Sequence, residues 1–137
     1  FVPIYNALWI NVPLLGDNPW SPEQEAMIRE TLAGWVDAFG PADLTCEIDG
    51  RPVADILSYR SPTPVGGAFM VDLPENDVWG LVGLTDVNGD IFQPGTYGPS
   101  IQDGIYLMLA PLSKGKHTIH FTAGDFLDVT YHLTVLK

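Results

Sequence analysis

The first residues with the chemistry to bind a ligand are the acidic and amide side chains of the segment DVNGD. Asp86, Asn88 and Asp90 alternate along it, and carboxylate and amide oxygens are the ligands that calcium prefers. The pattern of a helix-loop-helix calcium site then fails, because Ile91 stands where glycine is needed and Tyr97 where a bidentate glutamate is needed. We therefore predict an acidic turn, with a weak calcium site as the alternative and calcium as the only candidate cofactor.

Three aromatic residues, Trp79, Phe92 and Tyr97, lie in or beside the same segment. Aromatic rings exposed on a loop above a β-sandwich can stack on sugar rings or hold a peptide. They can equally cover the open end of the core. The three residues are our candidate ligand-binding set, with an unknown protein or a glycan as the partner.

The three histidines invite a test for a transition-metal site. In the segment KHTIHF the two-residue period of a strand sends His117 and His120 to opposite faces, so they cannot chelate one ion together. His132 points outward from the last strand and could approach His120 or Asp128 only in a suitable hairpin register. Polar cross-strand pairs are the commoner arrangement, and they are our expectation here.

The sequence contains no recognisable hydrolytic motif. No G-x-S-x-G nucleophile elbow is present, and the serines at 21, 58, 61, 100 and 113 lie in cap or turn contexts. Cys46, next to Glu47 in an alternating apolar segment, is expected to be a small core residue and not a reactive thiol. A non-enzymatic protein is the prediction, and a hydrolase with an unrecognised site remains an alternative.

Composition excludes several classes of partner. The chain has 137 residues and a formal net charge of -11, which would repel nucleic acid and anionic lipid surfaces. No apolar segment approaches the roughly 20 residues of a membrane-spanning helix.

With one cysteine no intramolecular disulfide can form, so packing alone must hold the fold. The length favours a single domain over residues 1–137.

One helix is predicted at about 22–39. Ser21 is a good N-cap, Pro22 suits the first helical position, Gln24 completes a capping box, and Gly40 with Pro41 ends the run. The apolar stripe expected to pack on the sheet is Met27, Ile28, Leu32, Trp35, Val36 and Phe39.

The remaining segments alternate as strands do. Residues 1–12 are apolar on both faces, which predicts a central strand, and Asp49-Gly50 predicts a tight hairpin after LTCEI. Further strands are expected in AFMVDLP, IYLMLAPL, KHTIHF and FLDVTYHLTVL, with a long loop at about 74–100. In the last strand the row expected to face the core is Leu127, Val129, Tyr131, Leu133 and Val135. This order predicts an all-β, antiparallel, immunoglobulin-like or jelly-roll-type β-sandwich with one helical insertion at 22–39.

The segments DLPENDVWGL, DGIYLMLAPLSKGKHTIHFTAG and FLDVTYHLTV resemble a group of uncharacterised secreted bacterial proteins. The likeness is strongest over the last third of the chain and looser in FVPIYNALWINVP and TCEIDGRPV. It implies a secreted or periplasmic protein with an immunoglobulin-like sandwich, and it supplies no activity. This chain lacks the cysteines common in that group, and its stretch at 83–99 is longer.

These observations favour a non-enzymatic, extracellular or periplasmic β-sandwich with a binding or assembly role. The loop at 79–99 is the predicted contact surface, and self-assembly through exposed strand edges is a second route. A carbohydrate- or calcium-binding module on the same loop is the alternative from a different class.

Overall fold

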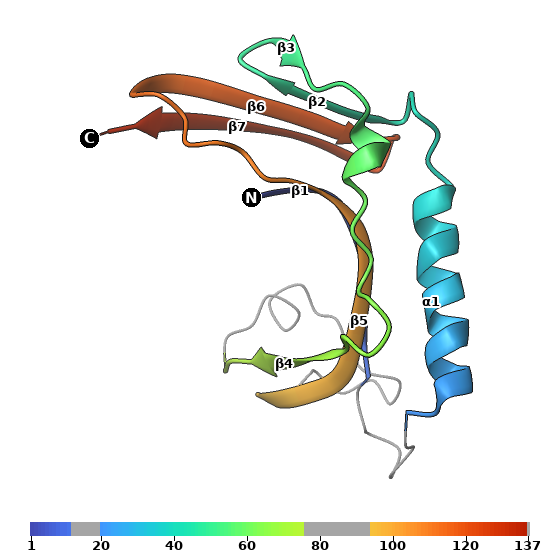
Figure 1. Ribbon diagram of the computed structural model, residues 1–137. Helices are drawn as coiled ribbons and strands as arrows, with labels where there is room; N and C mark the ends of the chain where they lie inside the picture. The colour runs from blue at the N-terminus through green and yellow to red at the C-terminus, as the bar shows by residue number, and fades with distance from the viewer. Residues whose placement is uncertain (12–19, 76–93, 137) are drawn as a thin grey trace.

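The structure is a computed structural model that describes residues 1–11, 20–75 and 94–136. Its elements form two antiparallel sheets and one α-helix, which confirms the predicted all-β sandwich with a single helix (Figure 1). In chain order they are β1 (Val2–Ile10), α1 (Pro22–Asp37), β2 (Leu44–Ile48), β3 (Arg51–Pro52), the 3-10 turn η1 (Ile56–Tyr59), β4 (Phe69–Leu73), β5 (Gly95–Leu107), β6 (Gly115–Ala123) and β7 (Leu127–Val135).

The two sheets share the main core. One sheet has the order β1-β5-β4 and the other the order β3-β2-β6-β7. Ile4 and Ile105 from the first sheet and Ile119 from the second are among the least exposed side chains. They belong to one buried cluster with Val2, Val36, Leu44, Cys46, Ile56, Leu107, Phe121 and Ala123. Burial of such side chains is the main driving force for the fold.

Helix α1 covers the part of β1 and β5 that forms a second buried cluster. Ser21 accepts a hydrogen bond from the Gln24 amide, and the Gln24 side chain accepts one from the Ser21 amide, as the predicted capping box requires. Ile28 and Leu32 pack on Ala7 and Ile101. Figure 1 shows the helix running alongside β5.

The predicted helical stripe is only partly buried, and the helix ends earlier than expected. Met27 is 60% exposed and Trp35 48% exposed, whereas Leu32 and Val36 are fully buried. The helix ends at Asp37, and Phe39 beyond it places its ring edge against Tyr5, with 4.7 Å between centroids. One helix face of this length contacts one sheet, so the flanks of a wide apolar stripe stay in solvent.

The prediction of a central first strand is wrong for the described part of the chain, where β1 lies at a sheet edge beside β5. Its two apolar faces have another cause. A register irregularity between Pro3 and Tyr5 interrupts the alternation of β1, so Ile4 and Ala7 are both buried although they are three residues apart, while Asn6 and Trp9 stay exposed.

The predicted loop at about 74–100 ends sooner than expected, because β5 already begins at Gly95. Its first residues pair with β4, and Tyr97 lies opposite Val71. At the other end β5 stops at Leu107, so the second half of IYLMLAPL is not a strand. Pairing with β4 overrides the poor strand propensity of GTYGPS, and the ladder with β1 begins only at Ser100.

The inward row of β7 is covered by the core at one end only. Leu127 and Val129 pack against the main cluster, but Tyr131 is 45% exposed and Leu133 is 37% exposed. The expectation that the whole row faces a closed core is therefore wrong. No helix in the described part of the chain is long and apolar enough to cross a membrane.

Candidate functional site

Most residues of the predicted binding and calcium sites lie outside the described residues. This holds for the aromatic pair Trp79 and Phe92 and for the candidate calcium ligands Asp86, Asn88 and Asp90. Tyr97, the remaining member of the aromatic set, is half-buried in β5 and does not sit on a loop. Its predicted loop location is therefore wrong, because the segment is recruited as a strand partner for β4.

One histidine of the last hairpin, His120, forms a polar cross-strand pair with an aspartate. His120 Nε2 lies 2.9 Å from Asp128 Oδ1 on the exposed face of β6 and β7. His132 stands opposite Thr118 and is not part of this pair. Among the described residues no group of three histidine, cysteine or carboxylate side chains could hold a metal ion.

A serine, a histidine and an aspartate meet where two turns lie together. Asp49 is the first residue of the Asp49-Gly50 turn between β2 and β3, with positive φ at both positions as a tight hairpin requires. His117 Nδ1 lies 2.8 Å from Asp49 Oδ2. Its Nε2 lies 3.5 Å from Ser113 Oγ and only 2.8 Å from the Ser113 carbonyl oxygen.

The protonation that these contacts demand argues against a nucleophilic triad. A catalytic histidine must present an unprotonated Nε2 to the serine hydroxyl. Here the shorter contact of Nε2 is to the Ser113 carbonyl, which can only accept, so Nε2 carries a proton. Nδ1 faces the Asp49 carboxylate and is a donor too. These two contacts together fit a charged His117 ring, in which both nitrogens donate and the side chain fastens two turns.

The electrostatics agree with that geometry. The Asp49 carboxylate and, next, the Ser113 carbonyl raise the pKa of His117 above its ordinary value. Reciprocally, His117 and the Thr118 amide hold the pKa of Asp49 below its ordinary value. Asp49 also accepts from the Thr118 amide, with 2.8 Å between nitrogen and Oδ1, so its carboxylate is fixed on both oxygens.

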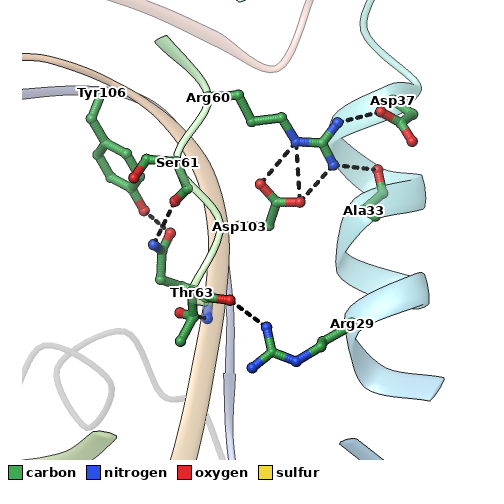
Figure 2. A network of polar contacts seen from close by, with 9 residues as sticks. Arg29, Ala33, Asp37, Arg60, Ser61, Thr63, Asp103 and Tyr106 are labelled. Atoms are coloured by element: carbon green, nitrogen blue, oxygen red, sulfur yellow. Dashed lines mark hydrogen bonds and ion pairs between the residues drawn. The ribbon is translucent and has the colours of Figure 1, made fainter. Parts of the chain in front are cut away.

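A second polar cluster joins helix α1 to the sheet through Arg60 (Figure 2). Asp103, on β5, is only 4% exposed. The Arg60 guanidinium donates to it from Nε, 3.0 Å from Oδ1, and from Nη2, 2.5 Å from Oδ2. Its Nη1 reaches Asp37 Oδ1 at 2.5 Å and its Nη2 the Ala33 carbonyl at 3.4 Å, both on the helix.

Arg29 fastens the other end of the helix to the same segment. It donates to the carbonyl oxygens of Thr63 and Pro64 and pairs with Glu25, with 2.6 Å between Nη2 and Oε1. Figure 2 shows the two arginines holding the residue 60–63 segment between β5 and α1. Thr63 in turn donates its amide to the Gln102 carbonyl at 2.8 Å.

A cleft of about 390 Å³ lies between α1, this segment and β5. Arg29, Arg60 and Asp103 line it together with apolar side chains such as Leu32 and Ile101. Since the nitrogens of both arginines already donate to carboxylates or carbonyls, the cleft offers an anion no free guanidinium. We assign this cluster to holding the fold together.

The sheet edges differ in how well they are protected against pairing with another chain. In the described part of the chain, β3 is two residues long with Arg51 and Pro52, β1 carries Pro3 and a register irregularity, and β4 has an irregularity after Phe69. Proline, charge, shortness and bulges are the common means of blocking edges. Strand β7 has nine residues, no proline and a continuous register with β6, and its one charged residue other than histidine is Asp128, near its start.

Sequence reasoning missed both polar clusters. Asp103 was detectable, since a carboxylate that alternates with Ile101 and Ile105 on one face of β5 must find a partner, but no local pattern indicated Arg60. Asp49 and His117 stand 68 residues apart, and only the register of β2 with β6 brings them together.

Comparison of the chain with protein-family models, with curated proteins and with solved structures finds no match.

Proposed function

We propose that this chain is a non-enzymatic, extracellular or periplasmic β-sandwich that binds an extended segment of another protein along the free edge of β7. The observation that carries the proposal is that, among the described strands, β7 is the last of its sheet and pairs on one side only. Strand addition at a sheet edge supplies main-chain hydrogen bonds for affinity and side-chain rows for specificity.

The side chains of β7 support this use of the edge. Tyr131 and Leu133 point from the inward face and are 45% and 37% exposed, and Leu136 just beyond the strand is 75% exposed. An added strand could continue this apolar row and bury it. The Tyr131 ring already rests against Phe121, with 5.9 Å between centroids, so part of the surface is rigid before binding.

Charge favours a foreign segment over a second copy of this chain. Two copies with a net charge of -11 repel each other as they approach. An extended segment that carries lysine or arginine on one face and apolar residues on the other is attracted to the protein and matches the apolar row.

The non-enzymatic part of the proposal is supported by the geometry at His117. The Ser113, His117 and Asp49 group has the residue types of a hydrolase, but its Nε2 lies 2.8 Å from the Ser113 carbonyl oxygen and 3.5 Å from the hydroxyl, so the nearer partner is not the nucleophile.

A charged substitution on the inward row tests the edge. We expect Leu133→Lys to weaken binding of a nine-residue peptide of alternating valine and lysine at least tenfold, because it places a charge within the apolar row. Thr31→Lys is the matched control, since it adds the same charge at an exposed position of α1, away from β7. Binding is measured by amide chemical shifts, which should move along β7 in the unsubstituted protein.

Two results would contradict this proposal. Equal loss in both variants, or shifts that avoid β7, would remove the edge as the contact surface. Sedimentation could instead show dimers that form with rising concentration and that Leu133→Lys abolishes. That result would mean that the partner at the β7 edge is a second copy of this chain and not a foreign segment.

The loop at 79–99 stays a separate prediction. Its residues up to 93 lie outside the described part of the chain, and Gly95 to Pro99 belong to β5. The calcium and carbohydrate alternatives depend on that loop, so they too remain predictions from the sequence.

A further inference from the structure

The contacts of His117 suggest more than a static link between two turns. Its side chain is only 10% exposed, and it bridges segments that belong to different parts of the sandwich. One is the Asp49-Gly50 turn of the β3-β2-β6-β7 sheet. The other is the connection at 108–114, which carries the chain from β5 of one sheet to β6 of the other.

Both bonds depend on one proton. Loss of the proton from Nε2 would place a nitrogen lone pair against the Ser113 carbonyl oxygen, 2.8 Å away, and turn an attraction into a repulsion. Loss from Nδ1 would set a lone pair against the Asp49 carboxylate, also 2.8 Å away. A neutral ring therefore satisfies one of its two neighbours at most.

We propose that His117 is a proton-dependent latch that holds the 108–114 connection to the Asp49-Gly50 turn when the ring is charged and releases it when the ring is neutral. The Ser113 hydroxyl, 3.5 Å from Nε2, is the group that can donate to the neutral ring after release. The latch thus exchanges a carbonyl partner for a hydroxyl partner.

Few charged groups compete for control of this latch in the described part of the chain. Asp49 is the carboxylate that acts on His117, and Arg51 acts in turn on Asp49. On the β7 side the residue opposite His117 is Leu133, which carries no charge. Lys114 and Lys116, the charged residues nearest in sequence, are exposed.

The pH range of the closed latch follows from the two pKa directions. Because the folded pKa of His117 is raised, its contribution to stability is complete below about pH 6.5 and is lost as pH rises through the folded value. Because the folded pKa of Asp49 is lowered, its contribution is present above about pH 3.9 and is lost as pH falls through the folded value. The latch is closed between the two folded values.

The test is an NMR titration of the full chain. We expect both ring nitrogens of His117 to be protonated in mildly acidic solution, with a pKa above the ordinary histidine value. In Asp49→Asn the pKa of His117 should fall, since asparagine tolerates the left-handed backbone of the turn but carries no charge. Protection factors of the amides in the 108–114 connection, which correct for the intrinsic rise of exchange with pH, should fall once the pH exceeds the pKa of His117.

Two control variants distinguish the latch from a general effect of surface charge and from a catalytic triad. Asp128→Asn removes the carboxylate beside the exposed His120 and should leave the titration of His117 unchanged. Ser113→Ala keeps the backbone carbonyl and should keep the closed latch, whereas a triad would lose its nucleophile. A His117 pKa at or below the ordinary value, or one insensitive to Asp49→Asn, would overturn the proposal.

Discussion

Replacing Gly104 by alanine is expected to destabilise the protein by about 3 kcal/mol or more, near the upper end of overpacking costs. A Cβ at this position would lie 2.6 Å from the Tyr5 carbonyl oxygen and 2.8 Å from the Tyr106 hydroxyl oxygen. The first contact is with the backbone of the neighbouring strand β1, where relief requires the sheet to move. Urea unfolding monitored by tryptophan fluorescence measures the change.

Gly34→Ala is the matched control for this substitution. Gly34 is exposed on α1, and a Cβ there meets nothing within 4 Å. Alanine is the better helix former, so this variant should gain about 1 kcal/mol. Similar unfolding midpoints for the two variants would show that the Tyr5 backbone leaves room for a Cβ at Gly104.

Arg60→Ala is expected to cost about 3 kcal/mol, the lower end of the range for breaking a buried ion pair. The variant leaves the Asp103 carboxylate buried without its guanidinium, and it also unfastens the end of α1. The lower end applies because the Arg60 side chain is itself 28% exposed and its charge is partly screened. Denaturant unfolding is again the measurement.

Asp37→Ala supplies the control, because Asp37 is the other carboxylate partner of Arg60 and its side chain is 64% exposed. Removal of such an exposed partner should cost less than about 1 kcal/mol. If the two variants lower the free energy of unfolding by the same amount, burial of Asp103 is not the reason that Arg60 stabilises the fold.

Local signals predicted the elements whose ends are set by their own residues. The capping box of Ser21 and Gln24 starts α1, and the Asp49-Gly50 pair forms the predicted tight turn. Alternation correctly located β2, β6 and β7, because each of them has one polar and one apolar row.

Features set by neighbours in space were not predictable in the same way. The start of β5 at Gly95 depends on partners far along the chain, since GTYGPS by itself resembles a loop. The exposure of Tyr131 and Leu133 depends on how far the opposite sheet reaches, and no pattern within β7 records that distance.

The candidate sites show the same division. The types of residue in the latch were visible, but Ser113 stood in a turn context and His117 at a strand start with no sign that Asp49 would join them. The sequence showed that β7 is a strand. It did not show that β7 is the last strand of its sheet, which only the order β3-β2-β6-β7 of the described strands reveals.

Cys46 gives the protein a built-in reporter of how often its two layers part. It is the only cysteine in the chain, it is 2% exposed, and it lies opposite Phe121 between the sheets. Burial and then the nearby Glu47 charge raise the pKa of its thiol, so the reactive thiolate is scarce as well as shielded. Alkylation by a maleimide must therefore wait for β2 to come away from the interior, and the rate at which the single mass increment appears reports how much of the protein is open when reclosing is fast.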